Sequence, residues 1–342
     1  MNSTCIPDVG YFDSPKFLSM VLHMNTIIST PIHLFGFYCI IWKTPMIMKS
    51  AKLYLLNLHF WIFSFDYSIS ILMMPFLLIP HYAGYTLGVL SWFDVSVLFQ
   101  TFMGLFFLAN MVASYVVLFE SRFYTVCEFA WKPYWKRWRK AGIIIYHVVV
   151  SCVTLSLAYT ELDQETEKRN MFKKLPCLPQ YIYEANIFVL CGDYSFQLAP
   201  IVVMHCFASV MVVLFALLLA WNLLVQLRSR TMSQRTYQLQ NAFLIALVIQ
   251  IMIPLCTFII PITYIELAIV FRWYKQLFTN FGISLISMHG FSSSLTMILV
   301  HRPYRDALLI FFEENVTVRF GESSFRRFLR YRRDVSVGAV SS

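Results

Sequence analysis

Seven stretches of this chain are each at least 20 residues long and free, or nearly free, of Asp, Glu, Lys and Arg. A helix needs about 20 apolar residues to cross the roughly 30 Å of hydrocarbon in a bilayer. Backbone polar groups cannot stay unpaired in lipid, so each stretch must cross as a helix. The predicted membrane helices are residues 18–42, 53–80, 95–119, 141–160, 194–227, 241–265 and 276–300. The pattern predicts an all-α membrane protein built as a seven-helix bundle.

The composition also favours a membrane protein over a soluble one. Of the 342 residues, 58% are hydrophobic and only 13% are charged, whereas a soluble domain carries about 25% charged residues. A chain this apolar needs the lipid bilayer as part of its solvent. The formal net charge of +9 does not indicate a nucleic-acid partner, because the basic residues lie in the segments that flank the predicted helices.

The positions of the basic residues predict the orientation. If the N-terminus is outside, the predicted cytoplasmic segments hold 20 of the 27 Lys and Arg residues. Cytoplasmic loops of membrane proteins carry such an excess. We therefore expect an extracellular tail (1–17), a membrane bundle (18–300) and a cytoplasmic tail (301–342) that starts with an amphipathic helix at 302–312. The expected location is the plasma membrane, as a multi-pass protein.

Asp66 is the one acidic or basic side chain within a predicted helix. A carboxylate near the middle of a bilayer is costly, and by default it is a hypothesis of function. In one interpretation Asp66 is an intramembrane switch that binds sodium or a proton and biases helix packing. In the other it is a hydrogen-bonded Asp that faces polar neighbours such as Ser287 or Asn110.

The histidines do not form a metal-site pattern. Six of the eight lie within predicted helices, but no two are spaced four residues apart on one helix, as the paired zinc ligands of a hydrolase would be. Scattered polar residues that bond between helices explain them. We expect neither a metal nor a cofactor.

Three cysteines, Cys5, Cys177 and Cys191, lie on the predicted outer side, where the environment permits disulfides. Cys177 and Cys191 are the candidate pair, although three cysteines allow three pairings. On the same side, Asn2 begins an Asn-Ser-Thr sequence and is a candidate glycosylation site.

Short motifs occur in a characteristic order along almost the whole chain. In the first half they are Phe12-Asp-Ser-Pro15, Pro31-Ile-His33, Leu55-Leu-Asn-Leu-His-Phe-Trp61 and Phe119-Glu-Ser-Arg-Phe123. In the second half they are Leu175-Pro-Cys-Leu-Pro179, Met288-His-Gly290 and His301-Arg-Pro-Tyr-Arg305. This series closely resembles the nematode class H serpentine receptors. The resemblance implies a G-protein-coupled chemoreceptor of sensory-neuron cilia that binds a small extracellular molecule and activates a heterotrimeric G protein.

The sequence also departs from the rhodopsin-like pattern. The top of the third helix has no cysteine, and the seventh helix has no Asn-Pro-x-x-Tyr motif. Where rhodopsin-like receptors have adjacent Asp and Arg, this chain has Glu120-Ser121-Arg122. We expect Glu120 to hold Arg122 at rest and to release it to the G protein. The rest of the predicted G-protein face is Arg228, Arg230, Arg235, Arg302 and Arg305, unless these arginines only anchor the helices at the membrane interface.

A ligand pocket is expected in the outer half of the bundle. Prolines at 200, 254 and 261 favour bends in the fifth and sixth helices that would open a cavity there. The candidate pocket residues are Gln100, Thr101, Gln197, Tyr264, Phe278 and Ser284. The surroundings are otherwise aromatic and Met-rich, which suits small, mostly apolar ligands. The third helix has no acid to bind an amine, and the seventh has no lysine for a retinal Schiff base.

The alternative classes are a ligand-gated channel or transporter subunit, and an intramembrane enzyme. A transporter would carry internal repeats and more ionisable residues at the midplane, and an odd helix count with a lone Asp66 argues against it. An enzyme would need a clustered nucleophile and base, or metal ligands, and neither pattern is present. The sequence does not indicate an oligomeric state.

Overall fold

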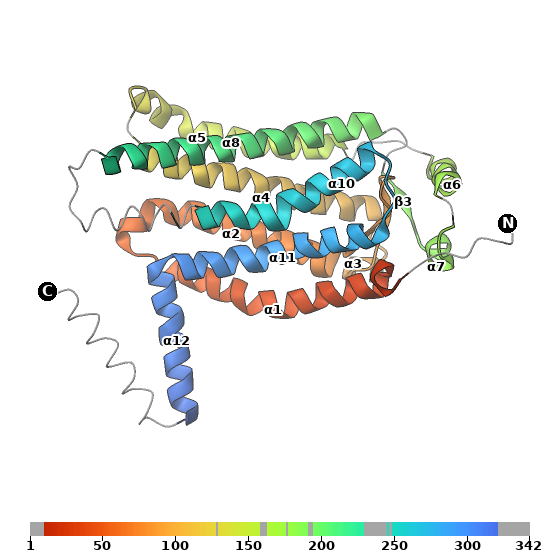
Figure 1. Cartoon of the computed structure of the whole chain (residues 1–342), viewed down its shortest axis with the longest axis horizontal. Helices are drawn as coiled ribbons and strands as arrows, with labels where there is room; N and C mark the ends of the chain where they lie inside the picture. Colours follow the sequence, from red (N-terminus) through yellow and green to blue (C-terminus); the bar gives the residue numbers. More distant parts are fainter. Residues whose placement is uncertain are drawn as a thin grey trace.

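The computed structural model describes residues 10–127, 129–157, 163–175, 177–190, 194–228, 245 and 248–320. Seven helices in these residues are long and apolar enough to cross a membrane, and they lie side by side along the long axis of the molecule (Figure 1). They are α1 (Pro15–Trp42), α2 (Lys49–Tyr67) with the π-helical turn η3 (Ser68–Leu72), α4 (Val97–Val126), α5 (Lys132–Leu157), α8 (Tyr194–Arg228), the span Val248–Val270 and α11 (Gln276–Val300). The span Val248–Val270 includes a second π-helical turn, η4 (Leu255–Ile259), and α10 (Ile260–Val270). The prediction of a seven-helix membrane bundle is confirmed.

Several helix boundaries differ from the prediction. The second membrane helix ends at Leu72 rather than at residue 80, because the chain then forms strand β1 (Pro75–Leu77). The fourth begins at Lys132, nine residues before the predicted start, because Lys and Arg at a helix end can extend their charged groups to the interface. The sixth continues to Val270 and so includes Glu266. The prediction that Asp66 is the only charged residue within a span is therefore wrong.

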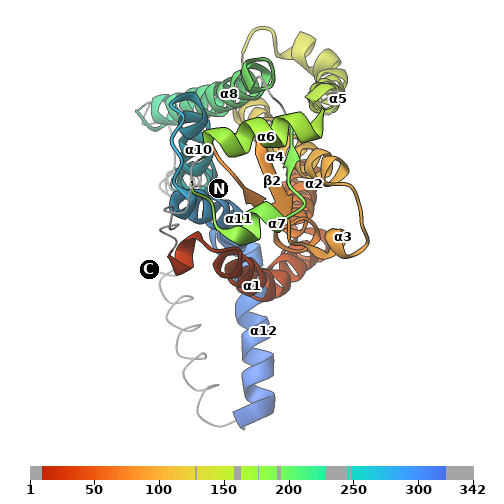
Figure 2. The same cartoon turned by 90° about the vertical axis from the view of Figure 1, so that its right-hand side faces the viewer.

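A small antiparallel sheet covers one end of the bundle, which we call the sheet end (Figure 2). Its strands are β1, β2 (Ala83–Thr86) and β3 (Phe188–Val189), in that order. Three short helices lie at the same end: α3 (Val89–Trp92), α6 (Gln164–Lys174) and α7 (Gln180–Glu184). Asp163 caps α6, and hydrogen bonds from Thr166 lower the pKa of its carboxyl. Buried side chains such as Phe76, Met171 and Ile182 bind this layer to the N-terminal half of α1.

At the opposite end, α12 (Arg302–Phe320) turns away from the bundle axis directly after α11 (Figure 1). We call this end the α12 end. A helix thus covers residues 302–312, where an amphipathic helix was expected. Tyr304 on its inner face is fully buried, and its hydroxyl lies 2.7 Å from Thr44 Oγ1, whereas Ile310 and Phe312 are exposed.

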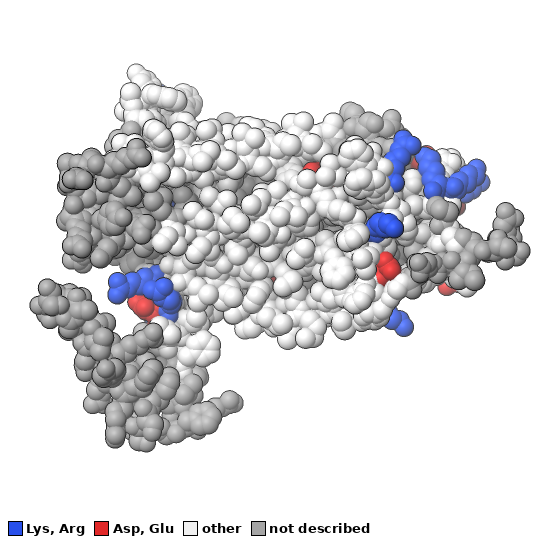
Figure 3. All heavy atoms as spheres, viewed as in Figure 1, with Lys and Arg blue, Asp and Glu red and all other residues white. Residues whose placement is uncertain are grey.

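The surface between the two ends is apolar. On the face in Figure 3, Lys and Arg lie at the two ends, and the band between them is almost free of charge. Large side chains on the membrane helices, among them Ile27, Ile144, Val203 and Trp221, are more than half exposed. Soluble proteins rarely expose continuous apolar surface on this scale. The chain is a multi-pass membrane protein.

Candidate functional site

A cavity of about 240 Å³ lies inside the bundle, next to the sheet. Its walls come from η3, α4, the sixth span and α11, and strands β1 and β2 close it toward the sheet end. The aliphatic side chains that line its walls include Ile69, Leu105, Leu108, Ile201, Ile262, Ile265, Ile269, Ile283 and Ile286. Such a surface binds its occupant mainly through apolar contact and shape.

Of the predicted pocket residues, Thr101 lines this cavity. Gln100 is buried beside it, but its Nε2 donates to the carbonyl of Val95 at 2.8 Å. Ser284 donates to the carbonyl of Asn280 at 2.8 Å, within its own helix. Neither side chain is part of the cavity wall.

The aromatic candidates lie outside the cavity as well. The rings of Tyr264 and Phe278 are 5.9 Å apart, and Phe278 is 52% exposed, so this pair faces the periphery of the bundle. Tyr264 contacts a separate small cluster with Ile79, Ala268 and Ile269. The side chain of Gln197 lies outside the described residues.

The spacing of isoleucines in the sequence does predict part of the cavity wall. Ile262, Ile265 and Ile269 are three and four residues apart, so they share one face of a helix. In the structure, that face lines the cavity. The polar candidates Gln100 and Ser284 do not face the cavity, because their side chains bond to nearby backbone carbonyls.

Asp66 is 2% exposed and holds three helices together. Its Oδ2 lies 2.9 Å from Nε2 of His33 on α1, and its Oδ1 accepts a long hydrogen bond of 3.4 Å from Asn25. The same Asn25 amide donates to the backbone carbonyl of Ser287 on α11 at 2.8 Å. On the far side of the imidazole, Nδ1 of His33 lies 3.0 Å from the hydroxyl of Ser294. We call these five residues the Asp66 network.

The two polar neighbours that were expected for Asp66 differ in outcome. Ser287 is joined to Asp66 through Asn25. Asn110 instead lies 2.9 Å from His147 and donates to Ser151, so it joins α4 to α5. The expectation that Asn110 faces Asp66 is wrong, because Asn110 lies on the opposite side of α4.

Two glycines allow the close helix contacts around this network. A Cβ on Gly290 would lie 2.9 Å from Cγ of Asp66, and a Cβ on Gly36 would lie 2.6 Å from Cε1 of His59. His59 in turn lies 3.0 Å from the carbonyl of His33. Small residues let membrane helices approach and bond in this way.

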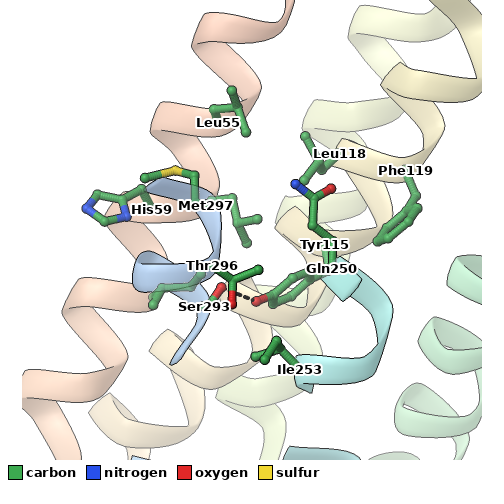
Figure 4. A pocket seen from close by; sticks show the side chains of 12 residues that line it. Leu55, His59, Tyr115, Leu118, Phe119, Gln250, Ile253, Ser293, Thr296 and Met297 are labelled. Carbon is green, nitrogen blue, oxygen red and sulfur yellow. Dashed lines mark hydrogen bonds between the residues drawn. The ribbon is translucent and has the colours of Figure 1, made fainter. Parts of the chain in front are cut away.

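A second polar junction connects the third, sixth and seventh membrane helices. Figure 4 shows the hydrogen bond between two of its members, Tyr115 and Ser293. The hydroxyl of Tyr115 on α4 lies 2.9 Å from both His289 Nε2 and Ser293 Oγ on α11. Nδ1 of His289 lies 3.0 Å from the hydroxyl of Thr257, which is in the π-helical turn η4 that follows Pro254. Such turns occur frequently at functional sites. A movement of the sixth helix would break the contact to His289.

At the α12 end, Glu120 is paired with Arg139 of α5. Nε of Arg139 donates to both carboxylate oxygens at 2.8 and 2.9 Å, and Nε1 of Trp135 donates to the same group at 2.8 Å. The expected ion pair of Glu120 with Arg122 is therefore wrong. Residues two positions apart on a helix do not face each other, so Glu120 and Arg122 point to different sides of α4.

Arg122 lies near the start of α12, within electrostatic range of Tyr304 and His301. Burial lowers the pKa of His301 to about 4, and the charge of Arg122 adds to this effect. Arg302 and Arg305 are exposed on α12.

The structure describes only some of the remaining predicted residues. The side chain of Arg228, and all of Arg230 and Arg235, lie outside the described residues, as do Cys191 and Asn2. Cys177 is disulfide-bonded, and its partner is not among the described cysteines. The described part of the chain contains no group of three or more His, Cys, Asp or Glu side chains that could hold a metal ion.

Comparison with solved structures finds a similar fold. The chain is similar to the crystal structure of squid rhodopsin, with a TM-score of 0.55 at 13% sequence identity, over 94% of each chain. The bundle therefore has the same overall fold as that rhodopsin. Residues 13–314 match the family described as "Serpentine type 7TM GPCR chemoreceptor Srh", and the chain belongs to this family. It is also 25% identical to Serpentine receptor class H-72 of Caenorhabditis elegans over 311 residues, which are 88% of this chain and 87% of that protein.

Proposed function

We propose that this receptor binds a small, mostly apolar molecule in the cavity at the sheet end and activates a heterotrimeric G protein at the α12 end. The sheet end faces outside the cell and the α12 end faces the cytoplasm. The protein acts in the plasma membrane, and its membership of a chemoreceptor family favours sensory-neuron cilia. The observation that carries the proposal is the aliphatic cavity between η3, α4, the sixth span and α11.

The cavity supports both the size and the chemistry of the ligand. An apolar cavity of roughly 150 Å³ is enough to bind benzene, so about 240 Å³ accommodates a somewhat larger molecule. Thr101, Thr86 and His81 are polar side chains at its lining. They could orient one hydroxyl, carbonyl or ester group of a ligand that is otherwise hydrocarbon.

Two observations support the orientation. Predicted cytoplasmic segments contain most of the Lys and Arg residues, as membrane insertion favours. The disulfide-bonded Cys177 lies at the sheet end, which suits an oxidising, extracellular environment.

The coupling mechanism follows from differential binding. Ile262, Ile265 and Ile269 of the sixth span line the cavity, and Thr257 on the same span contacts His289 at 3.0 Å. A ligand that packs better on a displaced sixth helix favours the conformation in which this contact is broken. It shifts the equilibrium only by that difference in affinity. The displacement would expose Arg122 and the surfaces around it to the G protein.

The experiment measures nucleotide exchange on a purified G protein by the receptor in lipid nanodiscs. The ligand comes from a screen of volatile and soluble compounds, with calcium imaging in cells that express the chain. Ile262→Trp fills the cavity and should raise the half-maximal ligand concentration by at least tenfold. Ile260→Trp is the matched control, because Ile260 is 55% exposed on the outer surface of the same helix.

Equal potencies in the two variants would refute this position of the ligand. A ligand-dependent ion current without nucleotide exchange would instead support the channel alternative. Surface expression, measured in parallel, separates loss of binding from loss of folding.

A further inference from the structure

A second hollow lies outside the ligand cavity, on the lipid-facing surface at the α12 end. It is a groove of about 480 Å³ between α4, α5 and α8. The floor is formed by Val116, Val117 and Phe215, and the sides by Trp131, Trp138, Tyr146, Phe207 and Met211. Trp131 and Trp138 are 65% and 67% exposed. Glu120, a residue of the predicted G-protein face, also lines the groove, where it is paired with Arg139. No groove residue lines the proposed ligand cavity.

We propose that this groove binds one phospholipid with an anionic headgroup, from the cytoplasmic leaflet of the membrane. One of its two acyl chains lies in the aromatic groove, and the headgroup contacts Arg137 beside it. The proposal rests on the membrane orientation given under the proposed function.

One side of the groove is formed by a single face of α5 and by Trp131, the residue before it. Lining residues Trp131, Trp135, Trp138, Gly142 and Tyr146 recur every three or four positions, so a single helix face is turned to the groove. Gly142 lies within this stripe, and a Cβ added there would meet no atom within 4 Å. The face is therefore open where a side chain would otherwise fill it, and an aliphatic chain fits the space.

The groove also has a positive charge beside it. Arg137 is exposed at the start of α5, and its guanidinium lies 5.9 Å from the ring centre of Trp138, a groove residue. Each basic residue next to an anionic membrane surface contributes about 1 kcal/mol of attraction. The combination of a cation and an apolar groove matches the two ends of an anionic phospholipid, whereas a sterol carries no charge for the cation to bind.

The groove wall also contains an unused hydrogen-bond donor. The guanidinium of Arg139 bonds to Glu120 through Nε and to Tyr54 through Nη1. Its Nη2 is buried and has no partner among the described atoms. An oxygen of a lipid phosphate or ester is an acceptor that suits this donor.

Native mass spectrometry of the whole purified receptor tests the proposal, with phosphatidylserine and phosphatidylcholine as probes. The wild-type receptor should retain one phosphatidylserine at least fivefold more strongly than phosphatidylcholine. Gly142→Leu should abolish this retention, and Arg137→Gln should weaken it roughly fivefold. The measurement needs neither ligand nor G protein, so its failure is distinct from failure of the proposed function.

Two controls match these variants. Ala141→Leu adds the same bulk one residue away, outside the groove lining, and Lys43→Gln removes the same charge elsewhere at the α12 end; both should retain phosphatidylserine as the wild type does. Equal retention of the two phospholipids, or equal effects of Gly142→Leu and Ala141→Leu, would overturn the proposal. So would displacement of the bound phosphatidylserine by cholesterol at equal concentration. Thermal unfolding of each variant, measured in the same detergent, identifies any that fail to fold.

Discussion

The helices α1, α2 and α11 form a half of the bundle that differs physically from the half formed by α8 and the sixth span. In the most apolar windows, 33% of the residues of α1 and 50% of those of α2 and α11 are buried inside the protein, against 17% in the fifth span and 11% in the sixth. The first half is held by protein contacts, and the second is mostly in contact with lipid.

The contacts themselves also differ in kind. Hydrogen bonds of the Asp66 network cross all three helices of the first half, and Gly290 and Gly36 let the helices approach closely. In the second half, the sixth span contributes Ile262 and Ile265 to the cavity wall. Its described polar contacts with other helices join single pairs of side chains, such as Glu266 with His205 and Thr257 with His289. Hydrogen bonds are directional, whereas apolar contact is not. The first half is thus suited to be a fixed frame, and the second half to move against it.

The largest expected effect comes from removing the centre of the fixed frame. Asp66→Ala leaves the side chains of His33 and Asn25 without their carboxylate partner, and we expect it to lower the free energy of unfolding by about 3 kcal/mol. Thermal unfolding of the purified receptor measures this. Asp306→Ala is the control, since Asp306 is an exposed acid on α12, and its effect should stay within about 0.5 kcal/mol. Equal stabilities of the two variants would show that the Asp66 network does not hold the frame.

The next effect tests close packing in the same frame. Gly290→Ala brings a Cβ to 2.9 Å from Asp66, so α11 and α2 must separate. We expect the free energy of unfolding to fall by about 2 kcal/mol. Gly282→Ala, on the same helix, meets nothing closer than 3.8 Å. Because alanine favours a helix over glycine, this control should be neutral or stabilising. If both variants were equally stable, α2 and α11 would not be rigidly packed at this point.

A smaller effect is expected at the junction between the two halves. Tyr115→Phe removes the hydroxyl that contacts His289 and Ser293, and so releases one side of the His289 ring whose other nitrogen contacts Thr257 of the sixth helix. If this junction holds the sixth helix in the inactive position, its loss should favour the active state by about 1 kcal/mol, which raises basal nucleotide exchange roughly fivefold. Tyr264→Phe serves as the control, because the hydroxyl of Tyr264 makes no hydrogen bond among the described atoms. Unchanged basal exchange in Tyr115→Phe would place the restraint on the sixth helix elsewhere.

The smallest expected effect is a pH dependence of stability that comes from His301, at the α12 end of the fixed frame. Burial holds the pKa of His301 at about 4 in the folded protein, below its value of about 6.5 in the unfolded chain. The unfolded state therefore binds more protons between these values, and stability falls as the pH is lowered from about 6.5 toward 4. We expect the free energy of unfolding to fall by no more than about 1 kcal/mol, because solvent screens the charge of this interfacial group. His301→Gln should be less sensitive to pH over this range when unfolding is compared at pH 7.5 and pH 5; parallel curves would contradict the assignment.

The amino-acid sequence determined the number of membrane helices and the class of protein. These depend on the length of apolar runs and on ordered motifs, which are local properties of the chain. The same local reasoning singled out Asp66 correctly as a buried group, and the family resemblance was confirmed over residues 13–314. It placed Thr101 at the cavity as well.

Only the tertiary structure decided which side chains meet. Arg139 rather than Arg122 pairs with Glu120, because the partner comes from another helix whose rotation a sequence does not state. Apart from Thr101, the cavity is lined mostly by isoleucines and other apolar side chains instead of the polar candidates, for a related reason. Polar groups buried in a membrane must bond to one another, so Asn25, His33 and His289 join helices, and mostly apolar side chains bound the cavity.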